Sequence, residues 1–264
     1  MKPDVSIIEP VHNAEAFLPT MLDSFLRQTF EAWEAVCVDD ASLDGSWEIL
    51  SSYASNDQRI RLIRNPEGKG AGWSRNLAME HSSGRYVMFC DSDDWYEPNA
   101  CEKMIQAISS KNLDLVQCYA QIEIEGSMCA DNIPNIPNLE YFNPPLKFGG
   151  LFRRPHRGLN SLCWEKILSR EFLSKYHICF PSCSKHEDEV FCAACAIAAK
   201  RTAILPVPLY HYRVHGGSLM QSVQADENRI WRTNVQELSA WAGANGFEHS
   251  RLLRKYIRKW EVYF

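Results

Sequence analysis

The first 120 residues alternate short apolar runs with longer segments in which apolar side chains recur every three or four positions. The short runs have the length and composition of buried strands, and they occupy 5–8, 35–38, 60–63, 86–90 and 113–117. The segments between them have the periodicity of amphipathic helices and occupy 16–26, 46–53, 71–81 and 98–110. Strands that alternate with such helices indicate βαβ units, so the pattern predicts an α/β fold with a mostly parallel sheet.

The pattern changes after about residue 125. Residues 131–150 are rich in Pro, Asn and Gly, and we expect an irregular connection or a flap there. The apolar run 162–168 is compatible with either a strand or a helix. The elements expected beyond it are a helix near 187–199, a strand near 201–206, and helices over 228–260 that are interrupted at 243–246.

Composition places the chain among globular proteins, because 45% of its 264 residues are apolar and 23% are charged. The 28 basic and 33 acidic side chains leave a formal charge of −5. This argues against a nucleic-acid partner, since such a partner requires a dense basic surface. No segment approaches the roughly 20 apolar residues that span a bilayer, and the first residues lack the apolar core of a secretion signal. We therefore expect a cytoplasmic protein.

Ten cysteines are scattered through the chain, most of them inside apolar runs. In a reducing compartment such thiols are usually reduced and buried. One group has a spacing compatible with a zinc site, namely Cys179, Cys183, Cys192 and Cys195. The Ala-rich context of the last two favours a buried helix and plain packing over metal binding.

Polar residues follow three predicted strands at the point where each strand ends: His12-Asn13, Asp39-Asp40 and Asp91-Ser92-Asp93-Asp94. The carboxyl ends of parallel strands meet at one edge of a sheet, and ligands of α/β sheets bind outside that edge. The sequence therefore predicts that these three segments converge on a ligand site.

The spacing of Asp91 and Asp93 suits a hard cation. In an extended chain the two carboxylates point to one side, about 7 Å apart, and in a turn they come close enough to share the ion. Such a cation neutralises charge on a departing diphosphate. The alternative is a polar loop whose aspartates cap the helix near Pro98. Likewise, Asp40 either binds the edge of a nucleobase or belongs to a run of residues that form a turn and cap the next helix.

Five segments between residues 4 and 115 carry motifs in a recognisable order: Val5-Ser6-Ile7-Ile8-Glu9-Pro10-Val11-His12-Asn13, Leu26-Arg27-Gln28-Thr29-Phe30, Val38-Asp39-Asp40-Ala41-Ser42-Leu43-Asp44-Gly45-Ser46, Ser74-Arg75-Asn76 and Gly84-Arg85-Tyr86-Val87-Met88-Phe89-Cys90-Asp91-Ser92-Asp93-Asp94-Trp95. As a set they resemble family 2 glycosyltransferases with the GT-A fold. The resemblance implies a Rossmann-like, mostly parallel sheet flanked by helices, with a C-terminal helical extension on the acceptor side. It also implies an enzyme that transfers a sugar from a nucleotide-diphosphate donor and inverts the anomeric carbon.

By matched position, the resemblance assigns the pocket for the nucleobase to Pro10, His12, Asn13 and Asp40. The sequence departs from the family's pattern at two positions in or next to this pocket, His12 and Glu9. His12 replaces the aromatic residue that usually stacks on the base, although it still offers a flat ring. Glu9 stands where the strand is normally apolar, and a buried carboxylate there requires a partner or a proton.

The diphosphate end of the donor is assigned in the same way. Asp91 would face the ribose or the sugar, and Asp93 would hold Mg²⁺ or Mn²⁺ on the diphosphate. Arg75 belongs to an Arg-Asn step and would contact the donor. His215 follows a segment that resembles the family's Tyr-Arg-x-His motif, in which the late histidine closes over metal and phosphates. The alternative for His215 is an ordinary histidine with a satisfied hydrogen bond.

An inverting transfer needs a general base that takes the proton from the acceptor hydroxyl. Asp188 is our candidate, because 185–191 resembles the family's Glu-Asp step at the start of a helix. The spacing of Ser184 and Glu187 matches a capping box, which would assign Glu187 a purely structural role. Asp188 would then be the fourth helical residue, where the helix dipole favours its ionised form.

The last segment, 251–260, interleaves five basic residues with Leu, Tyr, Ile and Trp. Such a helix either lies on an anionic membrane or packs as an ordinary amphipathic helix with a solvated basic face. The resemblance divides the chain into a donor- and metal-binding half, an acceptor-side half with the flap and the base, and C-terminal helices: 1–120, 121–225 and 226–264.

The expected function is therefore transfer from a nucleotide-diphosphate sugar to a hydroxyl of a glycan or lipid-linked acceptor, in surface polysaccharide synthesis. UDP-sugars are favoured because they are frequent donors in the family. Contact with the inner face of the membrane is compatible with such an acceptor. Two alternatives remain open: a nucleotidyltransferase that uses a similar sheet edge, and a catalytically silent subunit that binds nucleotide sugars.

Overall fold

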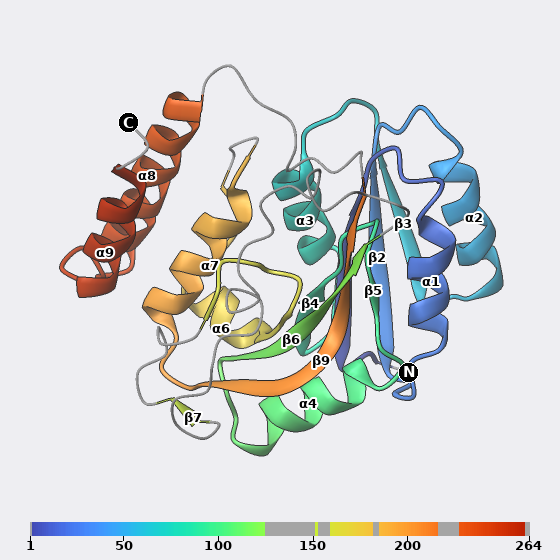
Figure 1. Ribbon diagram of the computed structural model, residues 1–264, viewed down its shortest axis with the longest axis horizontal. Helices are drawn as coiled ribbons and strands as arrows, with labels where there is room; N and C mark the ends of the chain where they lie inside the picture. Colours follow the sequence, from blue (N-terminus) through green and yellow to red (C-terminus); the bar gives the residue numbers. More distant parts are fainter. Residues whose placement is uncertain (1, 125–150, 153–158, 182–184, 216–226, 262–264) are drawn as a thin grey trace.

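The computed structural model describes residues 2–124, 151–152, 159–181, 185–215 and 227–261. Within these residues, nine strands form one mixed sheet in the order β3-β2-β1-β4-β8-β6-β9-β5, and β7 pairs with β9 (Figure 1). The strands are β1 (Val5–Val11), β2 (Trp33–Asp40), β3 (Ile60–Asn65), β4 (Tyr86–Phe89), β5 (Trp95–Tyr96), β6 (Leu115–Ile124), β7 (Leu151–Phe152), β8 (Lys166–Ser169) and β9 (Thr202–Val214).

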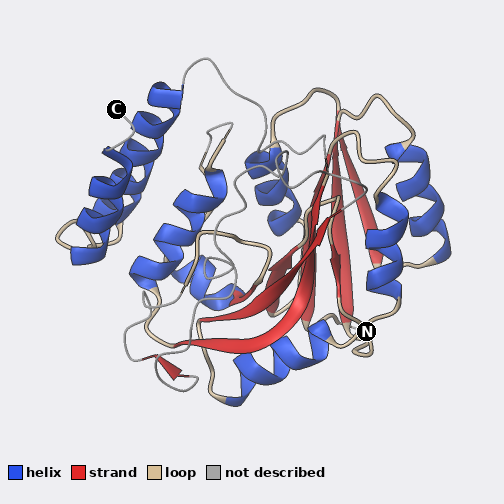
Figure 2. Cartoon of the chain, in the orientation of Figure 1, coloured by secondary structure: helices blue, strands red, loops and turns tan. Residues whose placement is uncertain are grey.

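Helices cover both faces of this sheet (Figure 2). The described helices are α1 (Leu18–Leu26), α2 (Ser46–Asn56), α3 (Ala71–Glu80), α4 (Ala100–Ser110), α6 (Arg170–Lys175), α7 (Glu187–Ala198), α8 (Glu227–Ala244) and α9 (Arg251–Trp260). All helices expected from periodicity are present, including the interruption between α8 and α9. The flap or irregular connection expected at 131–150 lies outside the described residues.

The sheet is parallel in its first half and mixed beyond it. β1 pairs in parallel with β2 and β4, and β2 with β3. β8 then joins β4 in the antiparallel direction, which identifies the second half of the ambiguous run 162–168 as a strand. The strand expected near 201–206 is longer than predicted, because β9 continues to Val214. Strands from both sides of residue 120 thus belong to one sheet.

Alternating side chains of the strands bury two separate cores. Ile7 of β1 packs into a core with α1, α2 and α4, whereas its neighbour Ile8 packs into a core with α3, α6 and α7. This follows from the period of two in a β-strand. α8 and α9 extend the second core, in which Trp231, Leu253 and Trp260 are buried. Among the described helices, none combines the length and the apolar character needed to cross a bilayer.

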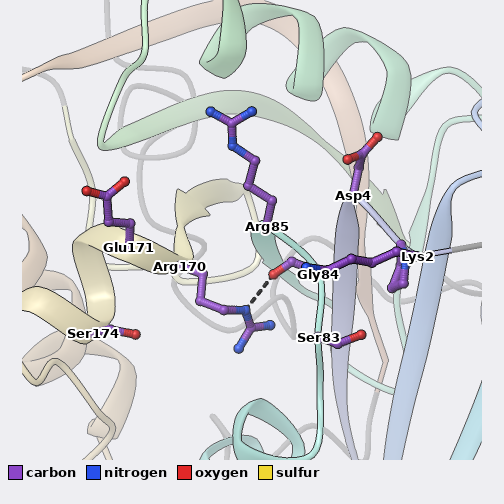
Figure 3. Close-up of a pocket in the computed structure, with 9 residues that line it drawn as sticks. Lys2, Asp4, Ser83, Gly84, Arg85, Arg170, Glu171 and Ser174 are labelled. Carbon is purple, nitrogen blue, oxygen red and sulfur yellow. Dashed lines mark hydrogen bonds between the residues drawn. The ribbon is translucent and has the colours of Figure 1, made fainter.

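The turn before β4 is fixed to the amino ends of the strands by buried polar groups. The carboxylate of Glu34 accepts hydrogen bonds from the backbone N–H of Gly84 and from the hydroxyl of Ser6. Arg170 donates to the carbonyl oxygen of Gly84 (Figure 3). A Cβ added at Gly84 would lie 2.5 Å from the amide nitrogen of Ser6. The close approach of these backbones therefore requires glycine at this position.

A cavity of 480 Å³ opens beside this turn. Figure 3 shows basic and acidic side chains around it, among them Lys2, Asp4, Arg85, Arg170 and Glu171. It lies where β1 and β4 begin, at the edge of the sheet opposite to the strand ends that carry the polar motifs.

Candidate active site

The three polar segments meet at the carboxyl edge of the sheet, as predicted. β1 lies between β2 and β4, and Val11 at its end pairs in register with Asp39 at the end of β2. Pro10, near the end of β1, is partly exposed at this edge. The Nδ1 atom of His12 lies 2.8 Å from the backbone oxygen of Asp40. The parallel register thus brings residues that are far apart in sequence to one site.

His12 and Asn13 form a hydrogen-bonded chain at the end of β1. The backbone oxygen of Asp40 only accepts, so Nδ1 of His12 carries the proton. The side-chain oxygen of Asn13 accepts from the backbone N–H of Leu43 at 2.8 Å. The amide group of Asn13 therefore faces Nε2 of His12, 3.0 Å away, and donates to it. These two contacts fix the orientation of the His12 ring.

The carboxylate of Asp40 is engaged by the loop that precedes α3. It accepts hydrogen bonds from the side chain of Asn65 at 2.7 Å and from the backbone N–H groups of Lys69 and Gly70 at 3.0 Å and 2.7 Å. Only 5% of Asp40 is exposed. Asp40 thus lies where the base pocket was predicted, but its carboxylate oxygens bind Asn65 and the loop before α3.

The turn that contains Asp91 and Asp93 is held by β9. The hydroxyl of Tyr210 accepts from the backbone N–H of Asp91 at 3.1 Å and donates to the carboxylate of Asp94 at 2.7 Å. Asp94 is fully buried and also accepts from the backbone N–H of Arg213 at 2.7 Å. Asp94 and Tyr210 were missed by sequence reasoning, and the only signal was the third aspartate of the motif.

Asp93 and His215 lie in contact, with Oδ2 and Nε2 3.0 Å apart. The sequence had assigned both to one metal. Burial and the nearby charge of Asp91 raise the pKa of Asp93, and the hydrogen bond to His215 opposes this. The side chain of Arg213 donates to the backbone oxygen of Asp93 at 2.8 Å and packs against the ring of Trp95. The carboxylate and the imidazole are thereby held side by side.

The side chains of Asp93 and His215 fit a divalent cation whose remaining ligands come from a substrate. Within the described residues, no group of three or more His, Cys, Asp and Glu side chains is arranged to hold a metal by itself. Mg²⁺ is usually bound by one or two carboxylates together with substrate phosphates and water. Asp93 offers one such carboxylate beside the imidazole of His215, and a diphosphate would supply further oxygens.

Glu9 lies beneath the site, fully buried in β1. Neither of its carboxyl oxygens has a hydrogen-bond partner among the described residues. Burial raises the pKa of Glu9 well above its usual range, and the negative charge of Asp91 adds to the effect. Of the two possibilities stated for this carboxyl, a partner or a proton, the structure supports the proton.

The first turn of α7 carries three consecutive carboxylates. Oε1 of Glu187 accepts from Arg75 at 2.8 Å, and Oε2 of Glu189 accepts from the indole N–H of Trp260 at 3.1 Å. The alternative of a capping box involved Ser184, which lies outside the described residues. In the structure α7 begins at Glu187 and its N-cap residue is His186. Glu187 forms an ion pair with Arg75 instead of capping the helix. Asp188, between the two glutamates, is the second helical residue rather than the fourth.

The protonation expected for Asp188 also needs correction. Burial raises the pKa of Asp188 to about 8, and the adjacent charge of Glu187 contributes, whereas Arg75 opposes the shift. The helix dipole favours the ionised form, but desolvation by the surrounding protein outweighs it. A carboxyl with such a pKa exchanges its proton near neutral pH, which suits a general base.

Arg75 connects the two sides of the site. Its Nη2 atom lies 2.7 Å from Oδ1 of Asp91, and its Nη1 atom lies 2.8 Å from Oε1 of Glu187. The Arg75 side chain is only 5% exposed. The turn after β4 and the first turn of α7 are therefore parts of one site. Both terminal nitrogens of Arg75 are used in this bridge, and a direct contact with the donor stays a prediction.

Among the described residues, the cysteines considered as zinc ligands belong to no group arranged to hold a metal ion. Cys192 and Cys195 are buried inside α7, as the Ala-rich pattern predicted, and burial raises the pKa of both thiols. Cys179 is exposed, and Cys183 lies outside the described residues.

The sequence profile described as "Glycosyl transferase family 2" matches residues 6–184. The chain belongs to this family. Among the relatives of this family 2 glycosyltransferase is EpsH of Bacillus subtilis (strain 168), a protein named as a glycosyltransferase. EpsH is 32% identical over 231 residues, which are 84% of the present chain and 64% of EpsH. WfgD of Escherichia coli, named a UDP-Glc:alpha-D-GlcNAc-diphosphoundecaprenol beta-1,3-glucosyltransferase, is 38% identical over 121 residues, 46% of each chain. The chain thus spans less than two thirds of both relatives.

Two solved structures confirm the GT-A fold of this family 2 glycosyltransferase. S. aureus TarS 1-349 in complex with UDP-GlcNAc has a TM-score of 0.81 and 20% sequence identity, covering 100% of this chain and 73% of TarS. The mannosyltransferase PcManGT from Pyrobaculum calidifontis, in complex with GDP-Man and Mn²⁺, has a TM-score of 0.62 and 17% identity, covering 92% and 74% of the two chains.

Proposed function

We propose that this family 2 glycosyltransferase transfers a sugar, with inversion, from a nucleotide-diphosphate donor to a hydroxyl of a glycan or a lipid-linked saccharide in surface polysaccharide synthesis. The observation that carries the proposal is the bridge through Arg75. It links Asp91, a strand-end carboxylate, to Glu187, the residue next to Asp188. The bridge supports the proposal because it connects a carboxylate on the proposed donor side to the helical turn that carries the proposed general base.

The donor is proposed to be a UDP-sugar. TarS was crystallised with UDP-GlcNAc, and the name of WfgD contains UDP-Glc together with a diphosphoundecaprenol-linked acceptor. The fixed ring of His12 would stack on the base, with Pro10 and Asn13 beside it. Asp40 would shape this pocket through the loop at Lys69 and Gly70, which it orders.

Asp93 and His215 would hold Mg²⁺ or Mn²⁺ on the diphosphate. When bound, the cation would supply charge neutralisation for the departing diphosphate. Asp188 takes the proton from the acceptor hydroxyl while the hydroxyl oxygen forms a bond to the anomeric carbon. The bond from that carbon to the diphosphate oxygen breaks at the opposite face, and the nucleoside diphosphate leaves with the electron pair. Attack from the opposite face inverts the anomeric configuration.

Product analysis tests this function against its alternatives. The protein is incubated with Mn²⁺ and a panel of nucleotide sugars, with and without saccharide acceptors, and the released nucleotide is identified by chromatography. We expect a nucleoside diphosphate and an inverted glycoside, whose configuration is read from its proton NMR coupling. Release of pyrophosphate would instead indicate nucleotidyl transfer. Donor binding without any release would indicate a silent binding subunit.

A membrane contact through α9 is proposed as a second feature. The apolar side of α9 is packed in the second core, where Leu253 and Trp260 are buried. Five basic side chains remain exposed: Arg251, Arg254, Lys255, Arg258 and Lys259. Such a face suits attraction to anionic lipid without insertion of the helix. Sedimentation with anionic vesicles at low salt tests it, and equal sedimentation with neutral vesicles would contradict it.

A further inference from the structure

We propose that Arg75 and Asn76 are positioning residues that hold the base-bearing turn of α7 at a fixed place relative to the donor carboxylates. The inference rests on the proposed function, since it takes Asp188 as the base and Asp91 as a donor-side group. The resemblance assigned Arg75 of the Arg-Asn step to donor contact, which stays a prediction. In the structure the side chains of Arg75 and Asn76 contact the first turn of α7 and the residue Phe180.

Arg75 supplies the ionic part of this connection. It is a buried guanidinium with one carboxylate on each terminal nitrogen, at 2.7 Å from Asp91 and 2.8 Å from Glu187. Paired hydrogen bonds from a planar guanidinium fix orientation as well as distance. Asp91 and Glu187 are thus held by the two terminal nitrogens of one rigid, planar group.

Asn76 supplies a second, uncharged connection. Its amide nitrogen donates to the backbone oxygen of Phe180 at 2.9 Å, and its side-chain oxygen accepts from the backbone N–H of Phe180 at 2.9 Å. The side chain of Asn76 therefore pairs with one residue of the backbone in the way a neighbouring strand would. This pairing fixes Phe180, which precedes α7 by seven positions in the sequence, to α3.

The aromatic packing beneath the two polar connections joins the same elements. The ring of Phe180 stacks on Phe191 of α7 with centroids 4.1 Å apart, and both rings meet the edge or face of Phe89 at 5.3 Å and 5.4 Å. Phe89 is the last residue of β4 and lies two positions before Asp91. This packing fixes the position of α7 relative to β4, the strand that precedes the candidate donor carboxylates.

The close approach of α3 to α7 depends on a residue without a side chain. A Cβ added at Gly72 would lie 3.0 Å from Cγ of Glu187 and 3.3 Å from the backbone oxygen of Pro181. α3 therefore contacts the first turn of α7 directly. From Gly72 to Asn76, this stretch of α3 forms one side of the base-bearing turn.

This arrangement predicts a separation between catalysis and donor affinity. If Arg75 and Asn76 position the base, their loss displaces Asp188 and lowers kcat, while the donor groups at His12 and Asp93 are untouched. A displacement of about 1 Å at a reacting group costs on the order of 100-fold in rate. If the two residues contact the donor, their loss weakens donor binding instead.

The test compares Asn76→Ala with Asn56→Ala, in which the lost side-chain hydrogen bond is a local one to Ser52 on α2. Calorimetric titration with UDP and Mn²⁺ gives donor affinity, and initial rates give kcat. We expect kcat to fall on the order of 100-fold in Asn76→Ala, with UDP affinity unchanged and Asn56→Ala like the wild type. Weaker UDP binding with an unchanged kcat would overturn the proposal, as would two unchanged values.

Arg75→Lys serves if Asn76→Ala does not fold, as judged by circular dichroism. A lysine is a point charge that does not bridge two carboxylates in a fixed geometry, so we expect the same loss of kcat. Because Arg75 also holds Asp91 on the donor side, donor affinity is compared in Asn76→Ala only. Hydrogen exchange in the first turn of α7 provides a readout that does not depend on turnover. Faster exchange in the variants supports the positioning role, and unchanged exchange contradicts it. An inactive wild type would refute the proposed function separately.

Discussion

Oδ2 of Asp93 lies 3.0 Å from Nε2 of His215, although 122 positions separate the two residues in the sequence. The contact arises because the end of β9 runs beside the turn that follows β4, where Tyr210 and the backbone of Arg213 hold Asp94. A carboxylate oxygen and an imidazole nitrogen are thus presented together at the carboxyl edge of the sheet. In the proposed metal site these two groups would be the protein ligands, and diphosphate and water would supply the others.

Removal of either ligand is expected to weaken metal-dependent donor binding. Asp93→Ala and His215→Ala should each lower the affinity for UDP in the presence of Mn²⁺ by about 10- to 100-fold, the range found for perturbed metal sites. The affinity is measured by calorimetric titration with and without Mn²⁺. His249→Ala is the matched control, because the His249 side chain is 93% exposed. A titration unchanged by Asp93→Ala would contradict the assignment.

The pKa of Asp188 predicts the pH dependence of transfer. A general base acts in its ionised form, so kcat/KM should rise about tenfold per pH unit in the acid range and level off above a midpoint near the free-enzyme pKa of about 8. Asp188→Asn removes the base and is expected to lower kcat by about 10²- to 10⁴-fold with UDP binding retained.

The control for Asp188→Asn is Asp4→Asn, the same chemical change at the opposite edge of the sheet. It should leave both the rate and the pH profile as in the wild type. A fully active Asp188→Asn variant, or a profile that is flat between pH 6 and pH 9, would show that another group takes the proton.

Glu9→Gln is expected to change the pH dependence of stability. The pKa of Glu9 is raised in the folded protein by burial and then by Asp91, while in the unfolded chain it is about 4.3. At pH values between these two pKa values, Glu9 is ionised in the unfolded wild type and protonated in the folded protein. Rising pH therefore stabilises the unfolded state, and the free energy of unfolding of the wild type decreases. Gln does not titrate. The advantage of the variant should therefore grow by about 1.4 kcal/mol per pH unit within this window.

Urea unfolding of both proteins at several pH values above 4.3 measures this difference. Glu31→Gln, at an exposed position, should show no such trend. A difference between wild type and Glu9→Gln that is constant with pH would mean that Glu9 is ionised in the folded protein.

Gly84→Ala is expected to destabilise the fold. The added Cβ would lie 2.5 Å from the amide nitrogen of Ser6 and 2.7 Å from the carbonyl carbon of Val5. Backbone atoms of the central strand yield little, so we expect a loss of about 1–3 kcal/mol, as for overpacked sites. The comparison variant is Gly243→Ala in α8, where the Cβ meets nothing within 4 Å. A gain of up to about 1 kcal/mol is expected there, and equal effects of the two changes on urea unfolding would refute the steric argument.

Much of the fold could be predicted from local pattern. The alternation of apolar runs and helical periodicity located the parallel half of the sheet, and the parallel register then brought His12, Asp40 and Asp91 to one edge. β5, β7 and α6 were not predicted, because two strands of two residues and a helix of six residues are too short to show a period. These elements exist because they pair or pack with distant parts of the chain.

The chemistry of the site shows where local reasoning ended. From the sequence, Glu187 was read as a possible helix cap and Asp188 as an ionised residue in the field of the helix dipole. Both interpretations used neighbours within one helical turn. In the structure, Arg75 reaches Glu187 from 112 positions away, and burial raises the pKa of Asp188 to about 8.

The sequence by itself determined which residue types stand at the ends of the strands, and hence the class of chemistry available there. Periodicity and motif order depend on side chains a few positions apart, and these are written directly in the chain. Only the tertiary structure decided which carboxyl groups are ionised, which are paired and which are shielded from water. Those properties depend on distances between residues that meet only after folding, because desolvation and Coulomb interactions act through space rather than along the backbone.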